Sequence, residues 1–159
     1  MPPPFVFQTR NRRPPKDPVN VILSIGYMMA HLEAVRAAAL AGLDPAIGVY
    51  QQTGRNRDSL ACDLVESARP LVEAWAIRLA SSGDIGTREF STGREGCTLL
   101  KAGRRIVYAS FESEALPLVR ARLALETAAL ARALREHAVR RPEMAALPAL
   151  PDDAGGDGA

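Results

Sequence analysis

The sequence contains few of the residues that would assign it to a class at once. It has two cysteines, two histidines and no run of about 18 apolar residues. Cys62 and Cys97 lie far apart, without a C-x-x-C motif or partnering histidines, so we expect reduced, buried thiols rather than a disulfide framework or a zinc site. The N-terminus has no apolar stretch of signal-peptide length, and the sequence therefore predicts a cytoplasmic protein that does not bind membranes.

Strong net charge is also missing. The formal net charge is +2 and hydrophobic residues make up 47% of the 159 residues, which excludes a histone-like polycation and a disordered chain. The length is that of one hydrophobic core. The charge is uneven, because residues 1–105 carry +4 and residues 106–159 carry −2. Eighteen of the twenty cations are arginine, a residue that suits phosphate contacts but is also common for reasons of codon composition.

The apolar pattern predicts a mainly α protein of about five helices in a single domain. Asp17 and Pro18 are a good N-cap and first-turn pair, and Pro70 is expected to break or kink the chain. The expected helices are residues 18–41, 59–69, 71–82, 102–111 and 113–141, with a small strand pair near residues 87–90 and 97–100. The predicted organisation is an extended basic arm at residues 1–16, a helical domain at residues 17–141 and a disordered tail at residues 142–159.

Two groups of residues are candidates for chemistry. Asp63 and Glu66 are three residues apart, so we expect them on one helical face, where paired oxygens can hold a hard divalent cation; such pairs also occur on most solvated helices. Two basic segments can converge on a phosphate backbone or simply be solvated: Arg10, Arg12, Arg13, Lys16, Arg55 and Arg57. His31 and His137 are expected to be surface or satisfied core histidines.

Four motifs in a fixed order carry a resemblance to a known family. They are RRPPKDPVN at residues 12–20, SIGY at 24–27, AGLDPAIGVY at 41–50 and SLACDLVESARPL at 59–71. Over roughly residues 10–135 the chain resembles the helical C-terminal domain of the Cas1 family, the CRISPR-associated adaptation endonuclease and integrase. The resemblance implies a helical domain that follows an N-terminal β domain in the family.

The resemblance also implies an activity and partners. Members of the family hold Mg²⁺ or Mn²⁺ with a glutamate, a histidine and a second carboxylate, and the metal assists DNA cleavage and the attack of a DNA 3′-hydroxyl on a phosphodiester. Two homodimers clamp a Cas2 dimer, and duplex DNA lies across basic surface.

Carried over residue by residue, the resemblance implies an incomplete metal site. No glutamate precedes Glu33, so the first ligand is expected to be absent, and Gln51 stands where the family has its histidine. Glu66 occupies the position of the metal carboxylate and Asp63 the supporting acidic position. One ligand of three should not hold Mg²⁺ or Mn²⁺ tightly.

These observations leave three hypotheses open. The chain is a truncated, catalytically inert homologue that binds DNA or acts as a scaffold, with Arg12, Arg13, Lys16, Arg55 and Arg57 as its DNA contacts. Alternatively, it is a component of an active metal-dependent endonuclease or integrase that another chain completes. A relic without a selected function is the third hypothesis. The expected partners are DNA, a second copy, a full-length integrase and Cas2.

Overall fold

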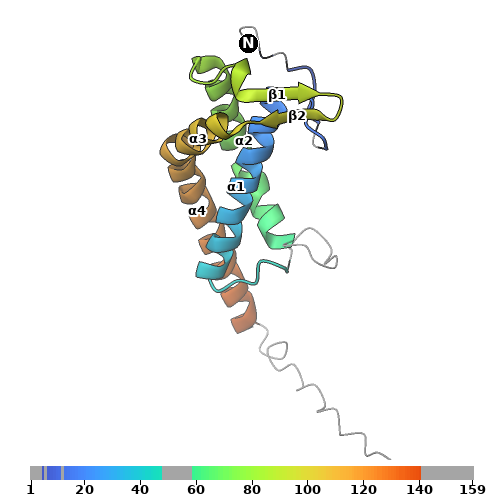
Figure 1. The fold of residues 1–159 in the computed structure, drawn as a ribbon. Helices are drawn as coiled ribbons and strands as arrows, with labels where there is room; N and C mark the ends of the chain where they lie inside the picture. The colour runs from blue at the N-terminus through green and yellow to red at the C-terminus, as the bar shows by residue number, and fades with distance from the viewer. Residues whose placement is uncertain (1–4, 6, 12, 48–58, 141–159) are drawn as a thin grey trace, which may run out of the picture.

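Four helices and one short hairpin make up the part of the chain that the structure, a computed structural model, describes: Phe5 and residues 7–11, 13–47 and 59–140 (Figure 1). In chain order the elements are α1 (Pro18–Leu40), α2 (Ser59–Ser82), a 3₁₀ turn (Thr87–Glu89), β1 (Phe90–Gly93), β2 (Gly96–Leu99), α3 (Lys101–Ser110), a π-helical turn (Phe111–Ala115) and α4 (Leu116–Arg140). The predicted mainly α fold class is confirmed.

Helix α1 begins and ends where the sequence predicts. The backbone N–H of Asn20 donates to Oδ1 of Asp17 at 2.9 Å, and Pro18 occupies the first turn, where its missing N–H has no intrahelical role. Gly42 follows the C-terminus with a φ of +74°, the left-handed conformation that glycine adopts without strain. Local sequence signals are therefore sufficient to define this helix.

Helix α1 is also apolar enough, by length and composition alone, to cross a membrane. Many of its apolar side chains lie in the core, because it packs against both α2 and α4, whereas Met28, Leu32 and Leu40 are exposed. The buried residues of its apolar face include Val19, Val21, Ile22, Leu23, Ala30, Ala34 and Ala38. Packing between helices thus accounts for part of the hydropathy of α1.

Helix α2 corrects the prediction of a break at Pro70. One helix runs from Ser59 to Ser82 with Pro70 inside it, where two helices were expected. A proline in a helix interior loses a backbone hydrogen bond and costs about 3 kcal/mol. Residues on both sides of Pro70, such as Leu64 and Trp75, are buried in the same core, and this shared packing outweighs the local cost.

Helices α1 and α2 approach closely at Gly26. A Cβ atom at this position would lie 2.7 Å from the ring of Trp75 and 2.8 Å from a methyl group of Val72. The absence of a side chain at Gly26 lets the indole of Trp75 pack against the backbone of α1. This close approach sets the spacing of the two helices that line the candidate site.

The hairpin joins the N-terminal segment to the helices. β1 and β2 are antiparallel, with Phe90 opposite Leu99 and Thr92 opposite Cys97. The first strand was expected to start at residue 87, but residues 87–89 form the 3₁₀ turn instead. The N–H of Cys97 donates to the carbonyl of Pro15 at 2.7 Å, and the buried ring of Phe5 packs edge-on against Phe90 at 5.8 Å.

Helices α3 and α4 are joined through the π-helical turn, whereas the sequence predicts two separate helices. The buried residues Val107, Phe111, Ala115 and Val119 are spaced four apart. In an α-helix each step of four residues rotates about 40° around the axis, so such a series drifts away from the core. The wider π turn reverses part of this drift and keeps the series on the core side.

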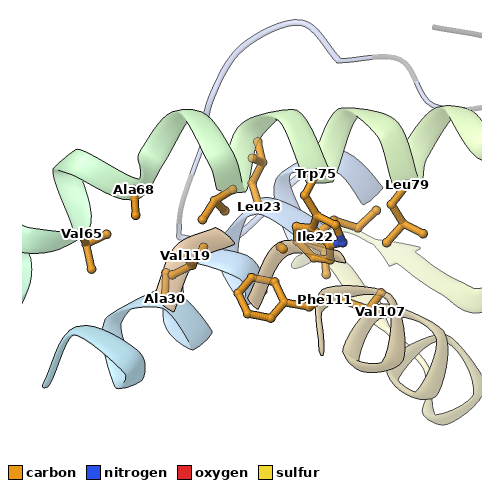
Figure 2. Packing of buried hydrophobic residues seen from close by; sticks show 14 of the residues in the cluster. Ile22, Leu23, Ala30, Val65, Ala68, Trp75, Leu79, Val107, Phe111 and Val119 are labelled. Atoms are coloured by element: carbon orange, nitrogen blue, oxygen red, sulfur yellow. The ribbon is translucent and has the colours of Figure 1, made fainter. Parts of the chain in front are cut away.

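Trp75 and Phe111 meet at the centre of the core (Figure 2). Their rings lie edge to face with centroids 5.0 Å apart, and Trp75 Nε1 donates to Ser110 Oγ at 2.9 Å. Figure 2 shows side chains of α1 (Ile22, Leu23), α2 (Leu79) and α3 (Val107) around this pair. The aromatic pair therefore ties α2 to the π turn.

An ion pair between Glu33 and Arg120 links α1 to α4 and gives the fold a predicted pH dependence. Nε and Nη2 of Arg120 donate to the two carboxylate oxygens of Glu33 at 2.8 and 2.9 Å, which lowers the pKa of Glu33 from its ordinary value of 4.5. A carboxylate with a lowered folded-state pKa adds stability above pH 4.5, and this stability is lost as the pH falls through the folded-state pKa. We expect Arg120→Gln to lower the melting temperature by about 1–3 °C at neutral pH.

Thermal unfolding followed by circular dichroism between pH 7 and pH 3 measures this effect. The difference between Arg120→Gln and the parent chain should shrink as the pH falls below 4.5. Arg122→Gln is the matched control, because Arg122 pairs with Glu126 on its own helix. A difference that is the same at every pH would contradict the assignment to Glu33.

Candidate functional site

The segment before α1 is fixed to the start of that helix by the buried side chain of Asn20. Oδ1 of Asn20 accepts from Nη1 of Arg10 at 2.8 Å and from the backbone N–H of Asn11 at 3.0 Å. Nδ2 of Asn20 donates to the carbonyl of Thr9 at 2.9 Å and to Oδ2 of Asp17 at 2.6 Å. One side chain thus holds three residues of the N-terminal segment and places Arg10 against α1.

Two arginines that are distant in sequence meet at Tyr27. The guanidinium of Arg10 lies 5.6 Å from the ring centroid of Tyr27, and that of Arg69 lies 5.5 Å from it. The Tyr27 hydroxyl donates to Glu73 at 2.6 Å. Burial, together with the hydrogen bond to Glu73, raises the pKa of Tyr27, so this hydroxyl keeps its proton.

Glu66 lines the same cavity as Tyr27 and forms an ion pair with Arg69. Nη1 of Arg69 is 3.0 Å from Oε2 of Glu66, and Nη2 of Arg69 is 3.6 Å from Glu73. The side chain of Glu66 is 60% exposed and lines an open cavity of about 320 Å³. The cavity, here named the arginine pocket, is lined by Arg10, Arg13, Ser24, Tyr27, His31, Cys62, Val65, Glu66 and Arg69.

Asp63 does not share this pocket. It lines a separate hollow between α2 and α4, together with Ser67 and Glu126. Residues three apart on a helix differ by about 60° around its axis. Glu66 lines the pocket beside α1 and the N-terminal segment, whereas Asp63 lines the hollow beside α4, so the two carboxylates open into different cavities.

Comparison with known proteins identifies the family of this chain. The family model described as CRISPR associated protein Cas1 matches residues 1–113 of the chain, which is more than half of its length. The chain belongs to the Cas1 family. The resemblance read from the four motifs is thereby confirmed.

This chain aligns with only part of each individual Cas1 protein. A CRISPR-associated endonuclease Cas1 of Thermodesulfovibrio yellowstonii is 45% identical over 108 residues, which cover 67% of this chain and 34% of that protein. A CRISPR-associated endonuclease Cas1 of Thermus thermophilus is 36% identical over 114 residues, covering 71% of this chain and 36% of that protein. The chain therefore spans about a third of the length of these relatives.

Solved structures share the fold. A Cas1 protein of Thermotoga maritima superposes with a TM-score of 0.74 at 26% identity, covering 80% of this chain and 42% of that chain. A chain in the partial Cas6-RT-Cas1–Cas2 complex superposes with a TM-score of 0.77 at 28% identity, covering 86% of this chain and 44% of that one. The shared part of the Cas1 fold is thus the helical region.

The structure brings together only some of the residues that the Cas1 resemblance singled out. Arg13 and Glu66 line the arginine pocket, and Lys16 lines a different hollow beside Asn11 and Asp17. Arg12, Gln51, Arg55 and Arg57 lie outside the described residues.

The remaining expectations concern the cysteines and histidines. Both cysteines are free, as expected; Cys97 is buried, which raises the pKa of its thiol, and Cys62 is only half-buried in the arginine pocket. His31 lines the same pocket, and His137 is exposed near the end of α4.

Tyr27 and Arg69 are pocket residues that the sequence reasoning did not select. A local signal for Arg69 was present, because Glu66, Arg69 and Glu73 follow the i, i+3, i+7 spacing of one helical face. Tyr27 had no such signal, since its contacts with Arg10 and Glu73 join segments that are distant in sequence.

The described residues of the pocket do not fit the divalent metal that the Cas1 resemblance implies. Within the part of the chain that the structure describes, no group of three or more His, Cys, Asp or Glu side chains is placed to hold a metal ion. Glu66 is paired with a guanidinium, and the pocket has three arginines to one carboxylate. A hard cation such as Mg²⁺ needs anchoring carboxylates and is repelled by this charge balance.

Proposed function

We propose that this chain is a DNA-binding member of the Cas1 family that does not itself cleave DNA with a divalent metal. The observation that carries the proposal is the pairing of Glu66 with Arg69 in a pocket that Arg10 and Arg13 also line. A carboxylate held by a guanidinium among further arginines is a poor metal ligand, whereas arginines in an open pocket attract phosphate. Binding without cleavage is the function that this arrangement supports best.

Scaffolding is part of the same proposal. A solved relative is a Cas1 chain in a complex with Cas2, and this chain has the helical fold found in that complex. A DNA-binding chain of this fold is therefore proposed to act beside Cas2 or another Cas1 chain.

A second candidate function has one observation in its favour. The side chain of Glu66 is 60% exposed, so another polypeptide can approach it and contribute further metal ligands. In that case the chain is a component of a metal-dependent endonuclease or integrase. The identity of residue 51 argues against this candidate, because a glutamine amide is a weaker ligand than the histidine that the family has there.

A nuclease and strand-transfer assay separates the two functions. We expect the purified chain to bind duplex and branched DNA and to leave it uncleaved in Mn²⁺, and Glu66→Ala to give the same result. Both proteins should show no product above the level of a protein-free reaction.

One further variant completes the assay. Gln51→His restores the family's ligand and shows whether that single residue limits activity. Mn²⁺-dependent cleavage that Glu66→Ala abolishes would overturn the proposal in favour of the enzyme component.

A further inference from the structure

Three arginines from two distant segments of the chain converge on the arginine pocket. Arg10 and Arg13 come from the segment before α1, and Arg69 comes from the middle of α2. The pocket is open and has a volume of about 320 Å³, enough for a phosphate group with its neighbouring atoms. The hydroxyl of Ser24 lies on the same wall.

The guanidinium groups of Arg10 and Arg69 are held in place by hydrogen bonds and ion pairs to neighbouring residues. Nη1 of Arg10 donates to Asn20 at 2.8 Å and to the carbonyl of Asn11 at 2.6 Å, and its Nη2 donates to Ser24 at 3.3 Å. Arg69 is held by Glu66 and by Glu73. Because their orientation is already set, little side-chain freedom is lost when an anion enters.

Among the described residues that line the pocket, Glu66 is the one carboxylate. Its carboxylate accepts a hydrogen bond from Nη1 of Arg69, and its negative charge repels an incoming anion. Its negative charge therefore opposes phosphate binding. For a metal site the same carboxylate would have the opposite effect, because its charge would hold the cation.

We infer that the arginine pocket binds a phosphate group of DNA directly, through Arg10, Arg13 and Arg69, with Glu66 as an internal competitor and without a bridging metal ion. The inference rests on the proposed function and adds the site and the ligand chemistry. Arginine suits this role because its planar fork of donors matches phosphate oxygens and its charge does not titrate at neutral pH.

Variants at Glu66 and Arg13 test the inference through effects of opposite sign. Binding of a fluorescent duplex is measured by anisotropy in EDTA and a phosphate-free buffer. Glu66→Gln should tighten binding about three- to tenfold, because the competing charge is removed while the shape is kept. Arg13→Gln should weaken binding about three- to tenfold and lower the slope of log K against log salt by about 1.

Arg132→Gln is the matched control, because Arg132 is exposed on α4 and does not line the pocket. Its affinity should stay within twofold of the parent chain. Both pocket variants change exposed side chains, and circular dichroism melting verifies that they fold. Weaker binding by Glu66→Gln, a requirement for Mn²⁺, or an Arg13→Gln affinity equal to that of Arg132→Gln would overturn the inference.

The source of the phosphate is determined by two further arms. Duplexes with 5′-phosphate and with 5′-hydroxyl ends differ in affinity if the pocket takes a terminal phosphate, and they bind equally if it takes a backbone diester. Inorganic phosphate should compete with either duplex at the pocket and lose this effect in Arg13→Gln.

Failure of the pocket can be distinguished from failure of the proposed function. DNA binding that is insensitive to both pocket variants leaves the proposed function standing and overturns the pocket. A chain that binds no DNA contradicts the proposed function, and the pocket is then tested by inorganic phosphate alone. In that experiment, shifts of the backbone amide NMR signals of Ser24 and Arg69 support the pocket, and unchanged signals overturn it.

Discussion

Replacement of Asn20 by alanine is expected to lower the free energy of unfolding by about 2–4 kcal/mol. The side chain is fully buried and makes four hydrogen bonds, to Arg10, to Thr9, to Asp17 and to the backbone of Asn11. Alanine leaves these partners without the group that satisfies them in a place where water enters poorly, and unsatisfied buried polar groups are costly. Chemical denaturation followed by circular dichroism measures the change.

The loss at Asn20 should also release the N-terminal segment. Hydrogen exchange at the backbone N–H of Asn11, which donates to Asn20 at 3.0 Å, is expected to become faster. Ser24→Ala is the control, because it removes the hydrogen bond from Arg10 at 3.3 Å and the one to the backbone carbonyl of Asn20 at 2.7 Å, but keeps the Asn20 side chain. Similar destabilisation by the two variants would contradict a central role for Asn20.

Phe111→Ala is expected to lower the free energy of unfolding by about 3–5 kcal/mol. The ring of Phe111 is fully buried, packs edge to face on Trp75 at 5.0 Å and lies at the start of the π turn that joins α3 to α4. Alanine leaves a cavity between α2 and the π turn that the surrounding helices cannot fill completely.

The measurement for Phe111 is again chemical denaturation, with the tryptophan fluorescence of Trp75 as a local probe. Phe7→Ala serves as the matched control, because Phe7 is a phenylalanine that is 40% exposed, and its loss should cost less than about 1 kcal/mol. An effect at Phe111 no larger than the effect at Phe7 would show that the aromatic pair is not central to the core.

Local rules predicted the helix ends but not the joints between helices. Asp17, Pro18 and Gly42 define α1 through capping and backbone preference, which depend on neighbouring residues alone. The same local reasoning placed a break at Pro70 and failed, because burial on both sides of the proline holds α2 together. It also missed the π turn at Phe111, which is set by the need to keep buried residues on one side.

The candidate site divides in the same way. Glu66 and Arg69 are neighbours on one helix, so their ion pair follows from spacing. The position of Arg10 beside Tyr27 depends on how Asn20 holds the N-terminal segment, and no sequence period encodes that contact. The separation of Asp63 from Glu66 likewise depends on which helix packs on each side of α2.

The sequence by itself determined the family, the mainly helical class and the residues available for chemistry, because motifs, caps and apolar spacing are properties of short stretches. Only the tertiary structure decided that Glu66 and Arg69 lie beside Arg10 and Arg13. A charge acts through its distances to other charges, and these distances are fixed by packing between segments that lie far apart in the chain.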